Sequence, residues 1–264
     1  MKNRLFAVVA LLICLVTYVQ AAEADKPAAQ NVGGIDSKDG GTITGVVRFK
    51  GTKPEVKPIS EIAGNGSCKE HYKDKPLPMH DTFVFGKHGD DDTLANVLVY
   101  VNKGLEGEKF DPPKRPAVLD QVGCMYTPHV VAVMTGQTLE IRNSDATLHN
   151  VMCNPRNNPG FNLGMPVKDQ VIEKAFNKPE LKINFRCFMH PWMSAYVHVL
   201  DHPFFAVTQA DGTFTIKGLP PGEYEVTALH ESTMLEPQPA TVPVKIAAGQ
   251  TQTADFTYSR RSEK

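Results

Sequence analysis

Hydrophobic and polar residues alternate with a period of two in many short stretches of this chain, whereas a 3.6-residue helical period is rare. Such alternation is typical of β-strands that bury one face. The stretches are rich in Val and Thr, and the 20 Gly and 20 Pro residues punctuate the segments between them. The pattern predicts an all-β protein. The main strands that we expect cover residues 42–49, 95–102, 130–134, 138–142, 182–187, 195–200, 223–228, 242–246 and 251–258.

Two segments lack this alternation. Residues 25–41 are polar and Gly-rich and predict a linker, and residues 54–92 are rich in Pro, Lys and Asp and predict mostly loop. The charge is nearly balanced, with 28 Lys and Arg against 29 Asp and Glu. The sequence has no dense basic patch with interleaved aromatic residues, so we do not expect nucleic acid as a partner.

The first 24 residues have the pattern of a secretory signal. Lys2 and Arg4 precede an apolar run over residues 5–19, and small alanines follow at the expected cleavage site. The run is short for a membrane span, which needs about 20 apolar residues. We therefore expect an exported protein, periplasmic or otherwise extracytoplasmic, with no membrane span in the mature chain; an uncleaved anchor is the alternative.

The most informative segment is Cys187-x2-His190-x2-Met193, which places a thiol, an imidazole and a thioether within seven residues. A second imidazole, His149, lies upstream in the segment Asn143 to Val151. Two His, one Cys and one weak axial Met are the ligand set of a mononuclear electron-transfer copper site. A decayed or purely structural version of the site is the alternative, because Met often only fills a core.

Around this motif, residues 116–202 resemble the cupredoxins, blue copper proteins of the plastocyanin and amicyanin kind. The short C-x2-H-x2-M loop matches amicyanin better than plastocyanin, whose loop is longer. The resemblance implies a Greek-key β-sandwich and one type 1 copper per chain, bound by His149, Cys187, His190 and Met193. It also implies that Asn150 ties the two ligand-bearing loops together. Trp192 would form either part of an apolar docking face or a rim that shields copper from water.

The function implied by this resemblance is the transfer of single electrons between redox partners, a cytochrome or a redox enzyme. His190, on a loop that we expect to be exposed, would be the exit for the electron. Two alternatives remain open: a periplasmic copper carrier, and a structural or adhesion module with a secondary metal site. We do not expect an enzyme, because the sequence has no H-x-H or H-C-H pair for a second, catalytic copper. Four other histidines are scattered along the sequence, and their one candidate role is as ligands of a second metal: His129, His198, His202 and His230.

Export affects the five cysteines. Cys14 falls in the signal and Cys187 in the copper motif, which leaves Cys68, Cys124 and Cys153 in an oxidising compartment. We expect Cys68 to pair with Cys124, although sequence alone does not fix the connectivity. Cys153 would then be a buried, inert thiol or would approach the metal.

A second signature lies near the C-terminus. Asp211-Gly212 predicts a hairpin turn within residues 206–216, and Gly218-Leu219-Pro220-Pro221-Gly222 predicts a tight turn before the next strand. This pattern resembles the carboxypeptidase regulatory-like β-sandwich, a small non-catalytic module. Its usual beginning resembles residues 45–47 and 95–99, far upstream.

We therefore expect the cupredoxin to be inserted into the regulatory-like sandwich. The expected organisation is a signal peptide (1–24), a linker (25–41), the first part of the regulatory-like sandwich (42–115), the cupredoxin domain (116–202), and the second part with the C-terminal tail (203–264). Simple tandem domains are the alternative.

Overall fold

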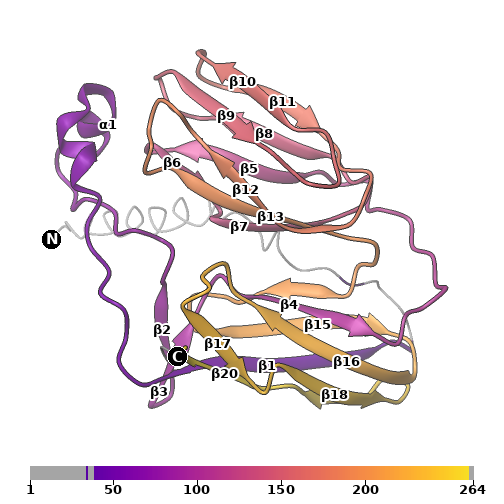
Figure 1. Ribbon diagram of the computed structural model, residues 1–264. Helices are drawn as coiled ribbons and strands as arrows, with labels where there is room; N and C mark the ends of the chain where they lie inside the picture. The colour runs from indigo at the N-terminus through magenta and orange to yellow at the C-terminus, as the bar shows by residue number, and fades with distance from the viewer. Residues whose placement is uncertain (1–33, 35–38, 262–264) are drawn as a thin grey trace, which may run out of the picture. The chain divides into compact units, whose positions relative to one another are not determined.

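The computed structural model describes residue 34 and residues 39–261. Within this part of the chain it contains 20 strands, one 3-10 helix and one α-helix, so the protein is all-β (Figure 1). No helix among these residues is long and apolar enough to span a membrane. The expected signal peptide (1–24) and most of the expected linker (25–41) lie outside the described residues.

Nine strands between residues 117 and 200 form a first sandwich around one apolar core. One sheet has the order β10-β9-β12-β13-β7 and the other has the order β11-β8-β5-β6. The strands are β5 (Ala117–Val122), β6 (Met125–Thr127), β7 (Val130–Met134), β8 (Leu139–Asn143), β9 (His149–Cys153), β10 (Phe161–Met165), β11 (Gln170–Lys174), β12 (Glu180–Arg186) and β13 (Ser194–Leu200).

The other eleven strands form a second sandwich around its own core. One sheet has the order β17-β20-β1-β3-β2, with β15 and β19 also paired to β1, and the other has the order β14-β4-β16-β18. The strands are β1 (Gly41–Lys50), β2 (Phe85–His88), β3 (Asp91–Leu94), β4 (Leu98–Lys103), β14 (Phe205–Val207), β15 (Thr213–Leu219), β16 (Gly222–Leu229), β17 (Leu235–Gln238), β18 (Thr241–Ile246), β19 (Thr251–Thr253) and β20 (Phe256–Arg260).

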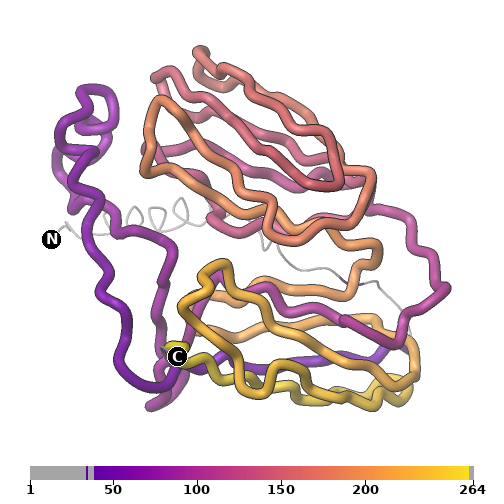
Figure 2. Tube along the Cα trace, viewed as in Figure 1, coloured from indigo at the N-terminus to yellow at the C-terminus, as the bar shows by residue number. Residues whose placement is uncertain are grey.

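Strands far apart in the sequence pair in this second sandwich, as the trace in Figure 2 lets the reader follow. β1 pairs antiparallel with β15 and parallel with β20, and β4 pairs antiparallel with β14 and β16. Chain that precedes the first sandwich is thus hydrogen-bonded to chain that follows it.

Burial explains which strands alternate. β16 alternates between buried and partly exposed positions, because one of its faces packs on the core and the other faces solvent. β7 is buried at every position. Val131 and Val133 of β7 enter the core of the first sandwich, while Val130, Ala132 and Met134 pack with residues of β4 and β14. Its unbroken apolar sequence reflects burial on both faces.

One local expectation holds and one is wrong. Residues 54–92 are mostly loop, interrupted by the 3-10 helix η1 (Ser60–Gly64), the helix α1 (Gly66–His71), β2 and the start of β3. The Asp211-Gly212 turn is tight, with Gly212 at φ +77° and its N–H bonded to the Gln209 carbonyl at 2.8 Å. The flanking strands β14 and β15 nevertheless belong to different sheets, so the turn carries the chain from one sheet to the other and makes no hairpin.

Candidate metal centre

The loop between β8 and β9 is organised by one buried amide, Asn143. Its Nδ2 donates to the carbonyls of Thr147 at 3.0 Å and Met165 at 2.9 Å, and its Oδ1 accepts from the Asp145 N–H at 3.0 Å. These bonds satisfy backbone groups that would otherwise be buried without partners. They hold the turn that leads into His149, the first residue of β9.

The loop between β12 and β13 carries the other three residues expected from the sequence. Met193 donates its N–H to the His190 carbonyl at 2.9 Å, and Cys187 donates its N–H to the Met193 carbonyl at 3.3 Å. The loop is therefore tightly closed at its base. Cys187, His190 and Met193 are 1%, 3% and 0% exposed, so all three side chains face the interior.

Three of the four expected ligands converge on one point. The Nδ1 atoms of His149 and His190 lie 3.0 Å apart, and the Cys187 Sγ lies 3.7 Å from the His190 Nδ1. One donor atom from each of the three residues lies within 4.8 Å of the other two. Met193 packs in the same core, and its role as an axial ligand stays a prediction.

Asp145 supports the His149 ring, which the sequence analysis missed. His149 donates its Nε2–H to Asp145 Oδ2 at 2.9 Å, which leaves Nδ1 to face His190. Asp145 is itself fixed by the N–H groups of Gly123 at 2.7 Å and Cys124 at 2.8 Å. A carboxylate that accepts the second ring N–H of a metal-binding His is a recurrent device. A carboxylate four residues before His149 was the available signal.

Asn150 joins the two loops that carry the expected ligands, as predicted. Its Oδ1 accepts from the Phe188 N–H at 3.1 Å, and its own N–H donates to the Cys187 Sγ at 3.4 Å. A thiolate that accepts a backbone N–H is stabilised in its charged form.

Electrostatics favour a thiolate at this point. Burial is the largest effect on Cys187 and opposes ionisation, but hydrogen bonds from His149, His190 and the Asn150 N–H together lower the pKa of the thiol to about 6. The pKa of His149 is raised: burial lowers it, while Asp145 and Cys187 outweigh burial. The pKa of Asp145 is lowered against burial, chiefly by the His149 hydrogen bond.

The remaining cysteines behave as expected. Cys68 and Cys124 form a disulfide, and Cys153 is a free, buried thiol. Cys153 lies on β9 opposite Phe185 of β12, and burial raises the pKa of its thiol to about 12. It belongs to none of the groups of possible metal donors among the described residues.

The expectation that His190 is exposed is wrong. Its side chain is covered, at 3% exposure, whereas the neighbouring Phe188 and Met189 are 59% and 50% exposed. Trp192, half-buried, packs beside the His190 ring at 5.2 Å between centroids and donates its Nε1–H to the Cys124 carbonyl at 3.0 Å. The exposed residues of the loop between β12 and β13 are therefore Phe188, Met189 and Pro191.

The four other histidines considered from the sequence are buried, and none joins a group of three possible metal donors among the described residues. His129 lies between two carboxylates, with Nδ1 3.1 Å from Asp81 and Nε2 2.5 Å from Glu231. Burial, the largest effect, lowers its pKa, but the two carboxylates outweigh it and raise the pKa to about 10. Burial lowers the pKa of His198 to about 3 and that of His230 to about 4, and it also lowers that of His202.

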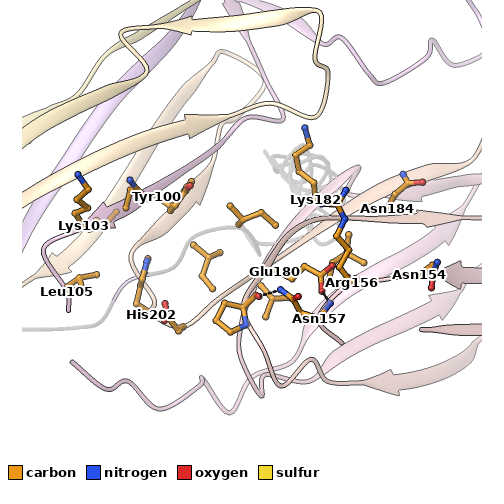
Figure 3. A pocket seen from close by; sticks show the side chains of 18 of the residues that line it. Tyr100, Lys103, Leu105, Asn154, Arg156, Asn157, Glu180, Lys182, Asn184 and His202 are labelled. Carbon is orange, nitrogen blue, oxygen red and sulfur yellow. Dashed lines mark hydrogen bonds between the residues drawn. The ribbon is translucent and has the colours of Figure 1, made fainter. Parts of the chain in front are cut away.

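A cavity of about 1080 Å³ lies elsewhere and contains none of the three converging donors. Its lining includes Tyr100, Lys103 and Lys182 (Figure 3). Glu180, also in the lining, is fixed by the backbone N–H groups of residues 156 and 157. The cavity mixes both signs of charge, which indicates no particular ligand.

Comparison with known proteins gives one family match. Residues 191–259 match the carboxypeptidase regulatory-like domain. The match begins in the loop between β12 and β13, before residue 203, where we expected the second part of the regulatory-like sandwich to begin. It therefore includes β13, which pairs with β12 and β7 in the first sandwich. No curated protein matches the chain significantly.

Solved structures similar to part of the chain include cupredoxins and a copper enzyme. The Cu-containing nitrite reductase from Thermus scotoductus SA-01 is 23% identical over 35% of this chain, with a TM-score of 0.30, and the match spans only 24% of the enzyme's chain. A purple cupredoxin from Nitrosopumilus maritimus is 20% identical over 31% of this chain and 97% of its own, with a TM-score of 0.27. A mutant of amicyanin in the Cu(I) form is 21% identical over 39% of this chain and 98% of its own, with a TM-score of 0.29.

Proposed function

We propose that this protein is a type 1 copper protein that carries single electrons between redox partners and performs no bond chemistry itself. One observation carries the proposal: two imidazole Nδ1 atoms 3.0 Å apart and a thiol sulfur 3.7 Å from one of them, all buried.

The donor set fits copper. A thiolate with two imidazoles suits both Cu(I) and Cu(II), and a thioether such as that of Met193 favours Cu(I). The lowered pKa of Cys187 makes the thiolate available at neutral pH. His149 is held as an Nδ1 donor because its Nε2–H is committed to Asp145.

Copper, when bound, supplies the single-electron couple; the residues of the chain supply its surroundings. The hydrogen bond from the Asn150 N–H to the Cys187 sulfur tunes the thiolate, and the complete burial of Met193 keeps water from that side. Such a fixed, dry site needs little rearrangement when one electron arrives or leaves.

The partner is a redox protein, and the protein works outside the cytoplasm, in keeping with the signal-like residues 1–24. Because His190 is covered, we propose that the partner approaches the exposed ligand-loop residues Phe188 and Met189. Cys187 is the chain neighbour of Phe188, so this surface lies within one peptide bond of the sulfur ligand.

The experiment compares two cysteine variants after loading with Cu(II). The wild-type protein should bind one copper per chain and show the intense colour of thiolate-to-Cu(II) charge transfer. Cys187→Ser should lose the colour and keep the β fold, as measured by absorption and circular dichroism. Cys153→Ser is the matched control, because this buried thiol lies outside the donor cluster, and it should stay coloured. A colourless wild type or a coloured Cys187→Ser would overturn the proposal.

A further inference from the structure

The Cys68–Cys124 disulfide lies directly beside the proposed copper site. The sulfur atoms of Cys68 and Cys124 and a ring nitrogen of His190 lie within 4.8 Å of one another. The three residues are 0%, 2% and 3% exposed. His190 therefore belongs to two sets of donors, one with His149 and Cys187 and the other with Cys68 and Cys124.

Bonds other than the S–S bond hold these two cysteines in place. Cys68 lies in the short helix α1, where its N–H donates to the Asn65 side chain at 3.2 Å. The Tyr72 hydroxyl, at the end of α1, donates to the Gly123 carbonyl at 2.8 Å. Gly123 and Cys124 form a turn, and the Cys124 carbonyl accepts a hydrogen bond from the Trp192 Nε1–H at 3.0 Å. Opening the S–S bond leaves all of these contacts available.

Apolar packing adds to this restraint. Ile59 and Ile62, which precede α1, are fully buried in the core of the first sandwich, together with Cys68 and Cys124. Burial of such side chains removes apolar surface from water and so stabilises the docked segment. The segment that carries Cys68 is thus held by contacts other than the disulfide, so we expect the two sulfurs of a reduced pair to remain beside His190.

We propose that Cys68, Cys124 and His190 form a second Cu(I) site, which exists only while the disulfide is reduced. Two thiolates and an imidazole are soft donors that select Cu(I), whereas a disulfide has no thiolate to offer. The inference rests on the proposed function only in that His190 is common to both donor sets. Cu(I) bound by Cys68, Cys124 and His190 shares the His190 ligand with the set formed by Cys187 and His149. The second site therefore serves to bind incoming copper before it is transferred to the first set.

The chemistry balances with an external dithiol as reductant. The S–S bond of Cys68–Cys124 breaks and takes up two electrons and two protons, while the dithiol loses both and becomes a disulfide. Binding of Cu(I) then releases the protons of both thiols. When an external disulfide takes up these two electrons with two protons and becomes a dithiol, the S–S bond of Cys68–Cys124 reforms, both thiolates are lost, and the ion returns to His190 and the first donor set.

The experiment uses the full chain in the background Cys14→Ser/Cys153→Ser/Cys187→Ser, which retains only Cys68 and Cys124 as cysteines. The protein is reduced with a phosphine, freed of reductant without oxygen, and titrated with Cu(I) against a competing Cu(I) chelator. The reduced protein should bind one Cu(I) per chain, and the unreduced protein should bind none. X-ray absorption should show two sulfurs and one nitrogen around copper.

Two imidazole variants test the assigned donors. His190→Ala should weaken Cu(I) binding by about tenfold or more, since even loss of an outer-shell partner of a metal ligand costs about 10- to 100-fold. His71→Ala is the matched control, because the His71 ring lies beside the same turn at Gly123 and should leave the affinity unchanged.

Several outcomes would overturn the proposal: equal binding by the unreduced protein, no binding by the reduced one, undiminished binding by a further Cys68→Ser or Cys124→Ser variant, or an effect of His71→Ala in place of His190→Ala. Circular dichroism and thermal melting of each apo variant identify loss of fold. Since the background lacks Cys187, the result is independent of whether wild-type protein forms a coloured Cu(II) site.

Discussion

Asp145→Asn tests how much of the metal affinity depends on the support behind His149. The carboxylate accepts three hydrogen bonds, from the Gly123 N–H at 2.7 Å, the Cys124 N–H at 2.8 Å and the His149 Nε2–H at 2.9 Å. An amide places an NH₂ group where one of the two oxygens was. Either the Gly123 donor alone, or the Cys124 and His149 donors together, would then face another donor.

The expected loss follows from these contacts. Removing the partner of a ligating His costs about 10- to 100-fold in metal affinity, which corresponds to about 1.4–2.7 kcal/mol. We expect Asp145→Asn to fall in this range and not to abolish binding, because His149, Cys187 and His190 remain. Competition against a Cu(I) chelator, with wild type and variant titrated side by side, measures the ratio of the two affinities.

Asp120→Asn is the control for this measurement. Asp120 is a neighbouring carboxylate that accepts from the Ser144 hydroxyl at 2.7 Å and is not bonded to His149. Its substitution should therefore change the affinity by less than about threefold, well below the 10- to 100-fold loss expected when the partner of a ligating His is removed. If Asp145→Asn retains wild-type affinity while the apo protein keeps its fold, His149 does not need this carboxylate and the reasoning fails. If both variants lose metal affinity equally, the loss comes from removing a negative charge near the site and not from removing the partner of His149.

Three further predictions follow from the same structure. Met193→Gln should keep copper and lower the reduction potential measured by voltammetry, because an oxygen donor favours Cu(II); an unchanged or raised potential would limit Met193 to packing. The raised pKa of His129, about 10, means that its contribution to stability is complete below pH 6.5 and lost as the pH rises through 10. The free energy of unfolding in urea should therefore fall over this range in wild type and less in His129→Gln; equal slopes would refute the role of His129. A fragment of residues 203–264 should fold poorly, because β15 and β16 lose their partners β1 and β4, and a sharp melt would favour tandem domains.

The strands and two of the converging donors, Cys187 and His190, could be predicted because their signals are local. Alternation places residues 130–134 on a strand with the same limits as β7, and the spacing of Cys187 and His190 fits one short loop. The role of Asn150 could be anticipated because it directly follows His149, an expected ligand. In each of these cases the residues that decide the structure lie within a few positions of one another. His149, 38 positions before Cys187, was instead expected from the ligand set of a copper site.

The covering of His190 could not be predicted in this way. The segment that approaches it, residues 59–72, precedes it by more than a hundred positions and has the composition of a loop. Its few apolar residues, Ile59 and Ile62 among them, are too sparse to show a period, yet they are fully buried. Long-range docking of a short segment on a finished sandwich leaves no periodic pattern in the sequence, which is why the expected exposure of His190 was wrong.

The turn at Gly123 and Cys124 explains why Asp145 was equally hard to find. The two backbone N–H groups of this turn hold Asp145, its two carbonyls accept from Tyr72 and Trp192, and the Cys124 sulfur binds Cys68. Gly123 has φ +64°, and a Cβ there would lie 2.7 Å from the Tyr72 hydroxyl, so only glycine fits without displacement. The orientation of His149 therefore depends on a turn fixed by contacts from three separate parts of the chain. A change in the docking of α1 should therefore alter the orientation of His149 through this turn, in addition to any effect on His190 through Cys68.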